Sequence, residues 1–150
     1  MTQILFKNIN AKDLHTLKVY EEQGGYQSLK KAFAKKPEEL IEMVKASGLR
    51  GRGGAGFPAG LKWSFLAKNV FPRYLCCNAD ESEPGTCKDR ELLLKNPHML
   101  IEGMILCSYA CQIETGYIYM RGEFHDLSFI MDKALEEAHA KGYLGKNILG

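Results

Sequence analysis

The chain has 150 residues, of which 45% are hydrophobic and 25% are charged, and its formal net charge is +2. This length predicts one domain with a substantial core, and the small net charge gives no argument for binding nucleic acid or an acidic membrane. The first residues lack the apolar stretch of a secretory signal, and no apolar run reaches about 18 residues, so direct membrane insertion is not expected. Five cysteines without a C-x-x-C pair indicate reduced thiols in a cytosolic setting.

Hydrophobic periodicity predicts an α/β chain whose N-terminal helices precede an incomplete parallel sheet. A weak alternation in residues 3–7 suggests a short strand, and apolar residues at helical spacing follow it. Asp126 is expected to cap the last helix. Helices are expected over 26–33, 37–48, 61–68, 89–95, 97–112 and 126–142, and two further strands over 73–78 and 116–120.

The order strand, helix, strand between residues 73 and 120 implies a parallel pair of strands with a crossover. The apolar helix over 97–112 should be buried against this sheet. Because stable open sheets usually have four to six strands, the sheet is expected to be incomplete. The sequence therefore looks like part of a larger protein.

The first segment with chemical content is rich in glycine and runs from residue 48 to 65. Residues 51–56 match G-x-G-x-x-G, but a helix is expected before them, which argues against the dinucleotide fingerprint. Glycines leave backbone N–H groups open to an anion, and Arg50, Arg52 and Lys62 add positive charge. The segment predicts a phosphate-binding loop, with a structural turn between two helices as the alternative.

Aromatic residues flank this loop. Trp63 is the aromatic residue most expected in the core, whereas an exposed Phe57 or Phe65 could stack on a planar base.

An acidic turn directly follows the strand expected over 73–78. Asn78, Asp80, Glu81 and Glu83 lie beyond its carboxyl end, where open α/β sheets bind ligands. These side chains can accept hydrogen bonds from ribityl, ribose and amide groups. A Mg²⁺ site and a solvated acidic turn remain the alternatives.

No metal site is expected among the cysteines. Cys107 and Cys111 are four residues apart on an expected helix, but zinc would need two more ligands at suitable spacing. We expect these two, together with Cys77 and Cys87, to serve as packing residues.

Three motifs resemble the flavin- and NADH-binding 51-kDa subunit family of respiratory complex I, the NADH-quinone oxidoreductase. The family also includes the diaphorase subunits of NAD-reducing hydrogenases and NAD-linked formate dehydrogenases. The motifs are GLRGRGGAGFPAGLKW over 48–63, CNADESEPGTCKDR over 77–90 and YIYMRGEF over 117–124. Ala59 departs mildly from the family, which usually has Thr there. The resemblance extends from about residue 14 to the end.

The resemblance implies an incomplete Rossmann-like parallel sheet and non-covalent FMN that takes hydride from NADH, without a catalytic acid or base. Its motifs imply FMN contacts from Gly51, Gly53, Lys62, Asn78, Asp80 and Ser82. They imply an NADH side made by Gly54, Ala55, Phe57, Phe65 and Glu83, and closure near the flavin by Tyr119, Gly122 and Glu123. Arg52, Gly56 and Glu81, which lie in the same motifs, complete the predicted cofactor-binding set.

The family continues with a second flavin-binding stretch, a ubiquitin-like domain and a helical bundle that carries a [4Fe–4S] cluster. None of these is in this sequence, and its cysteines do not match the cluster pattern. Residues 1–150 are therefore expected to be the N-terminal portion of the FMN/NADH-binding domain, inactive in isolation.

The resemblance also implies partners and a location. The expected partners are NADH and other subunits of an oxidoreductase, especially a small [2Fe–2S] subunit. The expected location is cytoplasmic, peripheral on the inner membrane through those subunits. Instead of a complex I subunit, the chain could be a diaphorase subunit of an NAD-linked hydrogenase or formate dehydrogenase, or a non-catalytic truncated module.

Overall fold

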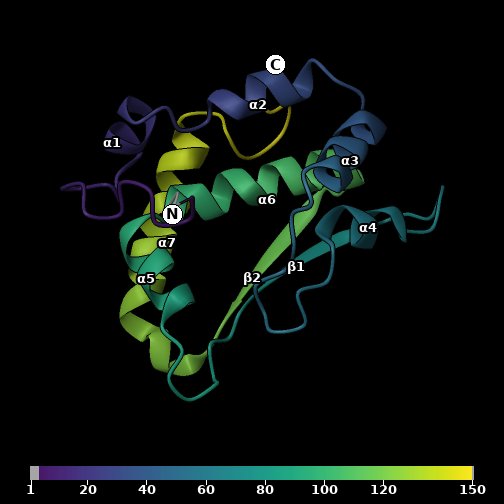
Figure 1. The fold of residues 1–150 in the computed structure, drawn as a ribbon. Helices are drawn as coiled ribbons and strands as arrows, with labels where there is room; N and C mark the ends of the chain where they lie inside the picture. Colours follow the sequence, from purple (N-terminus) through teal and green to yellow (C-terminus); the bar gives the residue numbers. More distant parts are fainter. Residues whose placement is uncertain (1–3, 150) are drawn as a thin grey trace. The chain divides into compact units, whose positions relative to one another are not determined.

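Figure 1 shows the computed structural model of the chain, which describes residues 4–149. The two strands form one parallel sheet, which confirms the predicted α/β class and its crossover. In chain order the elements are α1 Leu17–Glu22, α2 Gln27–Phe33, α3 Pro37–Ala46, α4 Ala59–Ser64, β1 Tyr74–Ala79, α5 Lys88–Lys95, α6 Pro97–Cys111, β2 Thr115–Met120, the 3-10 helix η1 Gly122–Phe124 and α7 His125–Ala140.

Some element predictions were wrong. Residues 4–10 form turns rather than a strand, because a short alternation without a partner strand gains no ladder of hydrogen bonds; residue 3 lies outside the described residues. Asp126 is not the cap of α7, since η1 runs directly into that helix and puts Phe124 at the cap position. Helix α1 was not predicted, and α4 begins at Ala59 because Pro58 precedes it with a fixed φ of −61°.

The chain divides into two compact units. The first comprises Met1–Gln27, Cys77–Gly103 and Ile118–Gly150, and the second comprises Ser28–Cys76 and Met104–Tyr117. In the first unit α7 packs against α1 and α5, and in the second α3 packs against α4. Within the described range 4–149, no helix is both long enough and apolar enough to cross a membrane.

The core of the second unit joins α2, α3 and the carboxyl half of α6. Ala32, Leu40 and Ala110 are buried there, and Trp63 of α4 packs against them together with Phe33, Ile41, Leu106 and Tyr109. The sequence expectation for Trp63 is therefore confirmed. At the start of β2, a Cβ on Gly116 would stand 3.2 Å from Met104 Cε, so α6 contacts the sheet at this point.

The contact between α3 and α4 depends on a glycine. A Cβ on Gly60 would lie 2.4 Å from the backbone nitrogen of Lys45 and 2.8 Å from its Cα. Backbone atoms cannot move aside as the end of a flexible side chain can, so the two helices would have to separate.

We expect Gly60→Ala to lower the free energy of unfolding by about 1–3 kcal/mol, the usual cost of overpacking. Gly103→Ala is the matched control, because this helical glycine of α6 is exposed and its added Cβ would meet nothing within 4 Å. The control should be neutral or should gain up to about 1 kcal/mol from helix propensity. Urea unfolding followed by circular dichroism measures both, and equal stabilities of the two variants would contradict the close-approach argument.

A buried polar network ties α1 and the residue before α2 to α6. Glu102 Oε2 accepts hydrogen bonds from Tyr20 Oη at 2.5 Å and from the Tyr26 backbone nitrogen at 2.9 Å. Tyr26 Oη lies 3.0 Å from His98 Nδ1, and the other ring nitrogen of His98 lies 3.1 Å from Glu137 Oε2. Burial lowers the pKa of His98, although the Glu137 carboxylate opposes that effect. This network fixes the N-terminal helix to the first unit.

The cysteines differ in their exposure. Cys111 is buried and Cys107 is half-buried, as expected of packing residues. The hydrogen bond from the Cys107 side chain lowers the pKa of Cys111, and the nearby Arg73 guanidinium adds to this. Cys77 is half-buried, but Cys87 is exposed, so the packing prediction is wrong for Cys87, which lies in the loop before α5.

Candidate functional site

The glycine-rich segment in the second unit forms a closed, exposed loop. A bridge between Arg50 and Pro58 closes it, and the Gly51 nitrogen donates to the Phe57 oxygen at 2.9 Å. The Arg50 Nη1 donates to the Gly56 oxygen at 3.0 Å across the loop. Gly56 has a φ of +61°, a conformation that favours glycine. The closed base holds residues 51–57 as a defined loop.

The tip of this loop offers free backbone donors. Within the part of the chain that the structure describes, none of the N–H groups of residues 52–56 donates a hydrogen bond. A Cβ built on Gly53, Gly54 or Gly56 would meet no atom within 4 Å, so the space above the backbone is open. Consecutive free N–H groups beside open space are a suitable cradle for a phosphate.

Cationic and aromatic side chains border the loop. Arg52 in the loop and Lys62 on α4 are exposed, and neither side chain pairs with another described residue. The rings of Phe57 and Phe65 are 44% and 66% exposed, and their centroids lie 6.0 Å apart at an angle of 55°. The predicted residues Gly51 to Phe57, Lys62 and Phe65 therefore all lie in one unit, and two of them, Phe57 and Phe65, are in ring contact.

The acidic turn belongs to the first unit and continues the alternation of β1. Asn78, Asp80 and Ser82 are exposed, whereas Ala79 and Glu81 between them are buried. The exposed side chains are linked, since Ser82 Oγ donates to Asp80 Oδ1 at 2.6 Å and the Asp80 nitrogen donates to Asn78 Oδ1 at 3.0 Å. The predicted ligands Asn78, Asp80 and Ser82 thus share one exposed side of the turn.

Glu81 faces the other way. This residue is 8% exposed, and its carboxylate accepts hydrogen bonds from the backbone nitrogens of Asp89 at 2.8 Å and Arg90 at 3.1 Å. These donors are in the first turn of α5, where backbone N–H groups lack helical partners. Glu81 therefore caps α5 from outside the helix. Glu83, two residues further on, is exposed.

The segment after β2 adds an arginine that the sequence interpretation did not single out. Arg121 Nη1 donates to the Glu81 carbonyl oxygen at 2.8 Å, while its Nε and Nη2 donate to the Glu123 carboxylate at 3.0 and 2.7 Å. The bond with Arg121 lowers the pKa of Glu123 to about 2. In the sequence, the one sign of this ion pair was an arginine two residues before a glutamate, just after a predicted strand. Tyr119 on β2 is 60% exposed, and Gly122 opens η1.

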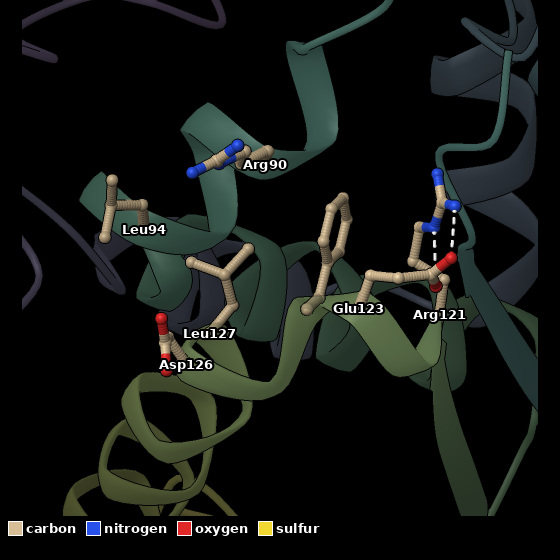
Figure 2. A pocket seen from close by; sticks show the side chains of 7 residues that line it. Arg90, Leu94, Arg121, Glu123, Asp126 and Leu127 are labelled. Atoms are coloured by element: carbon tan, nitrogen blue, oxygen red, sulfur yellow. Dashed lines mark hydrogen bonds and ion pairs between the residues drawn. The ribbon is translucent and has the colours of Figure 1, made fainter. Parts of the chain in front are cut away.

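Figure 2 shows an open pocket of about 410 Å³ in the first unit, close to this segment. Arg90 on α5 and Arg121 carry its positive charges, and Glu123 and Asp126 carry its negative ones. Leu94 and Leu127 supply apolar surface, and the dashed lines mark the pair of bonds between Arg121 and Glu123. Because the charges balance, this pocket has no excess positive charge that would favour a phosphate. Among residues 4–149, no group of three or more His, Cys, Asp or Glu side chains could hold a metal ion.

The chain is thus an α/β protein with a strand–helix–strand crossover. It has a glycine loop whose free N–H groups can bind an anion, and hydrogen-bond acceptors just beyond the carboxyl end of β1. These features are typical of proteins that bind nucleotide-type cofactors. Residues 44–148 match the family model described as the Nuo51 FMN-binding domain. The chain therefore belongs to the Nuo51 FMN-binding domain family, as the motifs predicted.

Known relatives agree with this assignment. The chain is 52% identical over 149 residues to the second NADH-quinone oxidoreductase F subunit of Rhizobium meliloti (strain 1021), covering 98% of this chain and 35% of that protein. It is 53% identical over 147 residues to the NADH-quinone oxidoreductase F subunit of Aquifex aeolicus (strain VF5), covering 98% and 34%. The chain thus spans about a third of the length of these curated relatives.

A solved structure shares the fold. A chain of an NAD⁺-reducing [NiFe]-hydrogenase in its H₂-reduced state superimposes with a TM-score of 0.72 at 33% sequence identity. The match covers 98% of this chain and 24% of the hydrogenase chain. The similarity confirms the predicted fold class.

Proposed function

We propose that this chain provides FMN- and NADH-binding residues of an NADH-quinone oxidoreductase, in which hydride passes from NADH to FMN. The observation that carries the proposal is the row of free N–H groups over residues 52–56, with open space above them and the unpaired cations Arg52 and Lys62 nearby. The family description and the names of the relatives support it.

The residues fit the chemistry of FMN. Backbone donors and cations of the glycine loop suit a phosphate, for which we propose Gly53 and Lys62 as the principal groups, with Arg52 and Gly56 shaping the loop. The Gly51 N–H is already bonded to the Phe57 oxygen at 2.9 Å, so we propose that Gly51 contacts FMN through the close approach of its backbone rather than as a donor. Asn78, Asp80 and Ser82 present exposed oxygen acceptors that suit ribityl hydroxyl and ring amide donors. When bound, FMN supplies a ring that accepts hydride, and the protein supplies binding, orientation and electrostatics.

The proposed NADH side uses different groups. The exposed rings of Phe57 and Phe65 lie side by side and offer an apolar surface on which an adenine can stack. The space beside Gly54 is open, and we propose Gly54 and the neighbouring Ala55 as the backbone that borders the NADH. Glu83 is exposed and suits a ribose or amide donor. Tyr119, Gly122 and Glu123 are proposed to close the site. No side chain has to move a proton, because the residues only hold the two reactants in line.

Flavin titration of the chain tests this proposal, with riboflavin as the ligand that lacks the phosphate. We expect Lys62→Gln to weaken FMN binding by about tenfold, the equivalent of losing one charge-assisted hydrogen bond, and to leave riboflavin binding unchanged. Lys68→Gln is the matched control, because Lys68 is an exposed lysine of the same unit without a partner among the described residues.

The control variant should bind FMN within about twofold of the unmodified chain. The proposal is contradicted if the chain binds no flavin, or if it binds FMN and riboflavin equally well and Lys62→Gln changes neither dissociation constant.

The wider assembly is part of the same proposal. We propose that the chain works with other oxidoreductase subunits, including a small [2Fe–2S] subunit, on the cytoplasmic side of the inner membrane, and that alone it does not turn over NADH. A diaphorase role in an NAD-linked hydrogenase is the second candidate, favoured by the hydrogenase structure that shares this fold. Mass spectrometry of the assembly purified from its source distinguishes them by the accompanying subunits. A chain that purifies alone and without flavin would instead be a non-catalytic module.

A further inference from the structure

The acidic turn of the first unit is held from its buried side. Residues 78–82 alternate between exposed and buried positions, so the turn keeps the pattern of a strand after β1 has ended at Ala79. No neighbouring strand pairs with residues 80–83 among the residues described. Something other than a sheet ladder must therefore keep Asp80, Ser82 and Glu83 outside and Glu81 inside.

The first anchor is the Glu81 carboxylate. Each of its oxygens accepts one backbone N–H of the first turn of α5, from Asp89 at 2.8 Å and from Arg90 at 3.1 Å. Hydrogen bonds to an ionised acceptor are strong, and the helix amino terminus adds its favourable dipole. Because both oxygens are engaged and the residue is buried, Glu81 holds the turn against α5.

The second anchor comes from Arg121, forty residues away in the sequence. The Glu123 carboxylate accepts hydrogen bonds from Nε and Nη2 on one edge of the Arg121 guanidinium, which fixes the plane of that group. In this orientation Nη1 donates to the Glu81 carbonyl oxygen at 2.8 Å. A lysine ammonium lacks this rigid fork and cannot reproduce the two-sided geometry. Main chain and side chain of Glu81 are therefore held by two independent partners.

We propose that Glu81 and Arg121 are positioning residues, which present Asn78, Asp80 and Ser82 to the flavin without contacting it. This inference rests on the proposed function, and it gives Glu81 a different role from the direct cofactor contact predicted from its motif. Arg121→Gln and Arg121→Lys should release the turn, and Glu81→Gln should do the same by replacing one acceptor with an NH₂ group. Arg90→Gln is the matched control, because its exposed side chain forms no bond with another described residue.

Hydrogen exchange of the full chain, without any ligand, tests the anchoring itself. In the two Arg121 variants and in Glu81→Gln, the amide protons of Asp89 and Arg90 should exchange at least about fivefold faster. The amide of Tyr26, which is bonded to Glu102 in the same unit, reports general loosening and should stay within about twofold. Unchanged exchange at Asp89 and Arg90 overturns the anchoring.

Titration with FMN and with riboflavin tests the positioning, under conditions where circular dichroism shows every variant fully folded. The Arg121 and Glu81 variants should bind both flavins about tenfold more weakly, because the turn is proposed to serve the ribityl chain and ring that the two ligands share. Arg90→Gln should bind both within about twofold. A role limited to global stability would leave these dissociation constants unchanged.

The possible failures are distinguishable. Faster exchange with undiminished flavin affinity overturns the positioning role and leaves the proposed function standing. A wild-type chain that binds no flavin overturns the proposed function and the positioning role with it, while the exchange rates still decide whether Glu81 and Arg121 anchor the turn.

Discussion

Glu102→Ala is expected to lower the free energy of unfolding by about 3 kcal/mol, the largest stability change that we predict for this chain. The substitution removes the acceptor for the Tyr20 hydroxyl and for the Tyr26 backbone N–H, which are buried and would lose their partner. Burial, together with the Glu102 carboxylate, raises the pKa of Tyr20, so its hydroxyl stays protonated and donates. An unpaired buried donor costs far more than the bond contributes.

The measurement is urea unfolding followed by circular dichroism in the far ultraviolet. Glu102→Gln keeps one amide oxygen as an acceptor, so its free energy of unfolding should fall by roughly half as much as that of Glu102→Ala. Glu136→Ala is the matched control, because Glu136 is an exposed glutamate of α7 without a partner in the described range, and it should stay within about 0.5 kcal/mol of wild type. A loss below about 1 kcal/mol for Glu102→Ala would show that the network does not stabilise the first unit.

Phe65→Ala is expected to weaken NADH binding to the FMN-loaded chain by about tenfold and to leave FMN affinity within about twofold. The ring is two-thirds exposed and lies beside Phe57, so its removal costs little packing but takes away a stacking surface for adenine. Glu83→Ala should act in the same direction through the loss of an exposed acceptor. Quenching of NADH fluorescence and flavin titration give the two affinities separately.

Phe129→Ala serves as the control for a lost exposed ring, since Phe129 on α7 is 63% exposed and belongs to none of the motifs. It should change neither affinity. An equal loss of NADH and FMN binding in Phe65→Ala would contradict the assignment of this ring to the NADH side.

The sequence predicted the regular elements where local signals were strong. The run from Pro37 carries a proline at its first position and glutamates in its first turn, and Glu39 does accept the Lys36 N–H at 2.7 Å at the start of α3. Both strands of the sheet and the long apolar helix between them were predicted within about one or two residues of where they lie. The fold class followed from their order, because a parallel connection requires a crossover.

Weak local signals led to the wrong predictions. The alternation in residues 3–7 had no partner strand, and α1 is a six-residue helix without a capping side chain. Helix α1 is held by Tyr20 and by the bond between the Leu17 nitrogen and Glu137 Oε2 at 2.8 Å. These stabilising contacts are with residues more than eighty positions away and do not affect the sequence pattern of the helix itself. The helix therefore could not be predicted from its own segment.

The sequence by itself determined the family and located the glycine loop and the acidic turn. Each of these is a contiguous run of residues whose types already indicate what it can bind. Only the tertiary structure decided which side chains of the turn face outward. Three carboxylates within four residues look equivalent in a sequence, yet Asp80 and Glu83 are exposed whereas Glu81 caps α5 and receives Arg121 at its carbonyl. That difference arises from hydrogen bonds between residues eight to forty positions apart, which only the folded chain brings together.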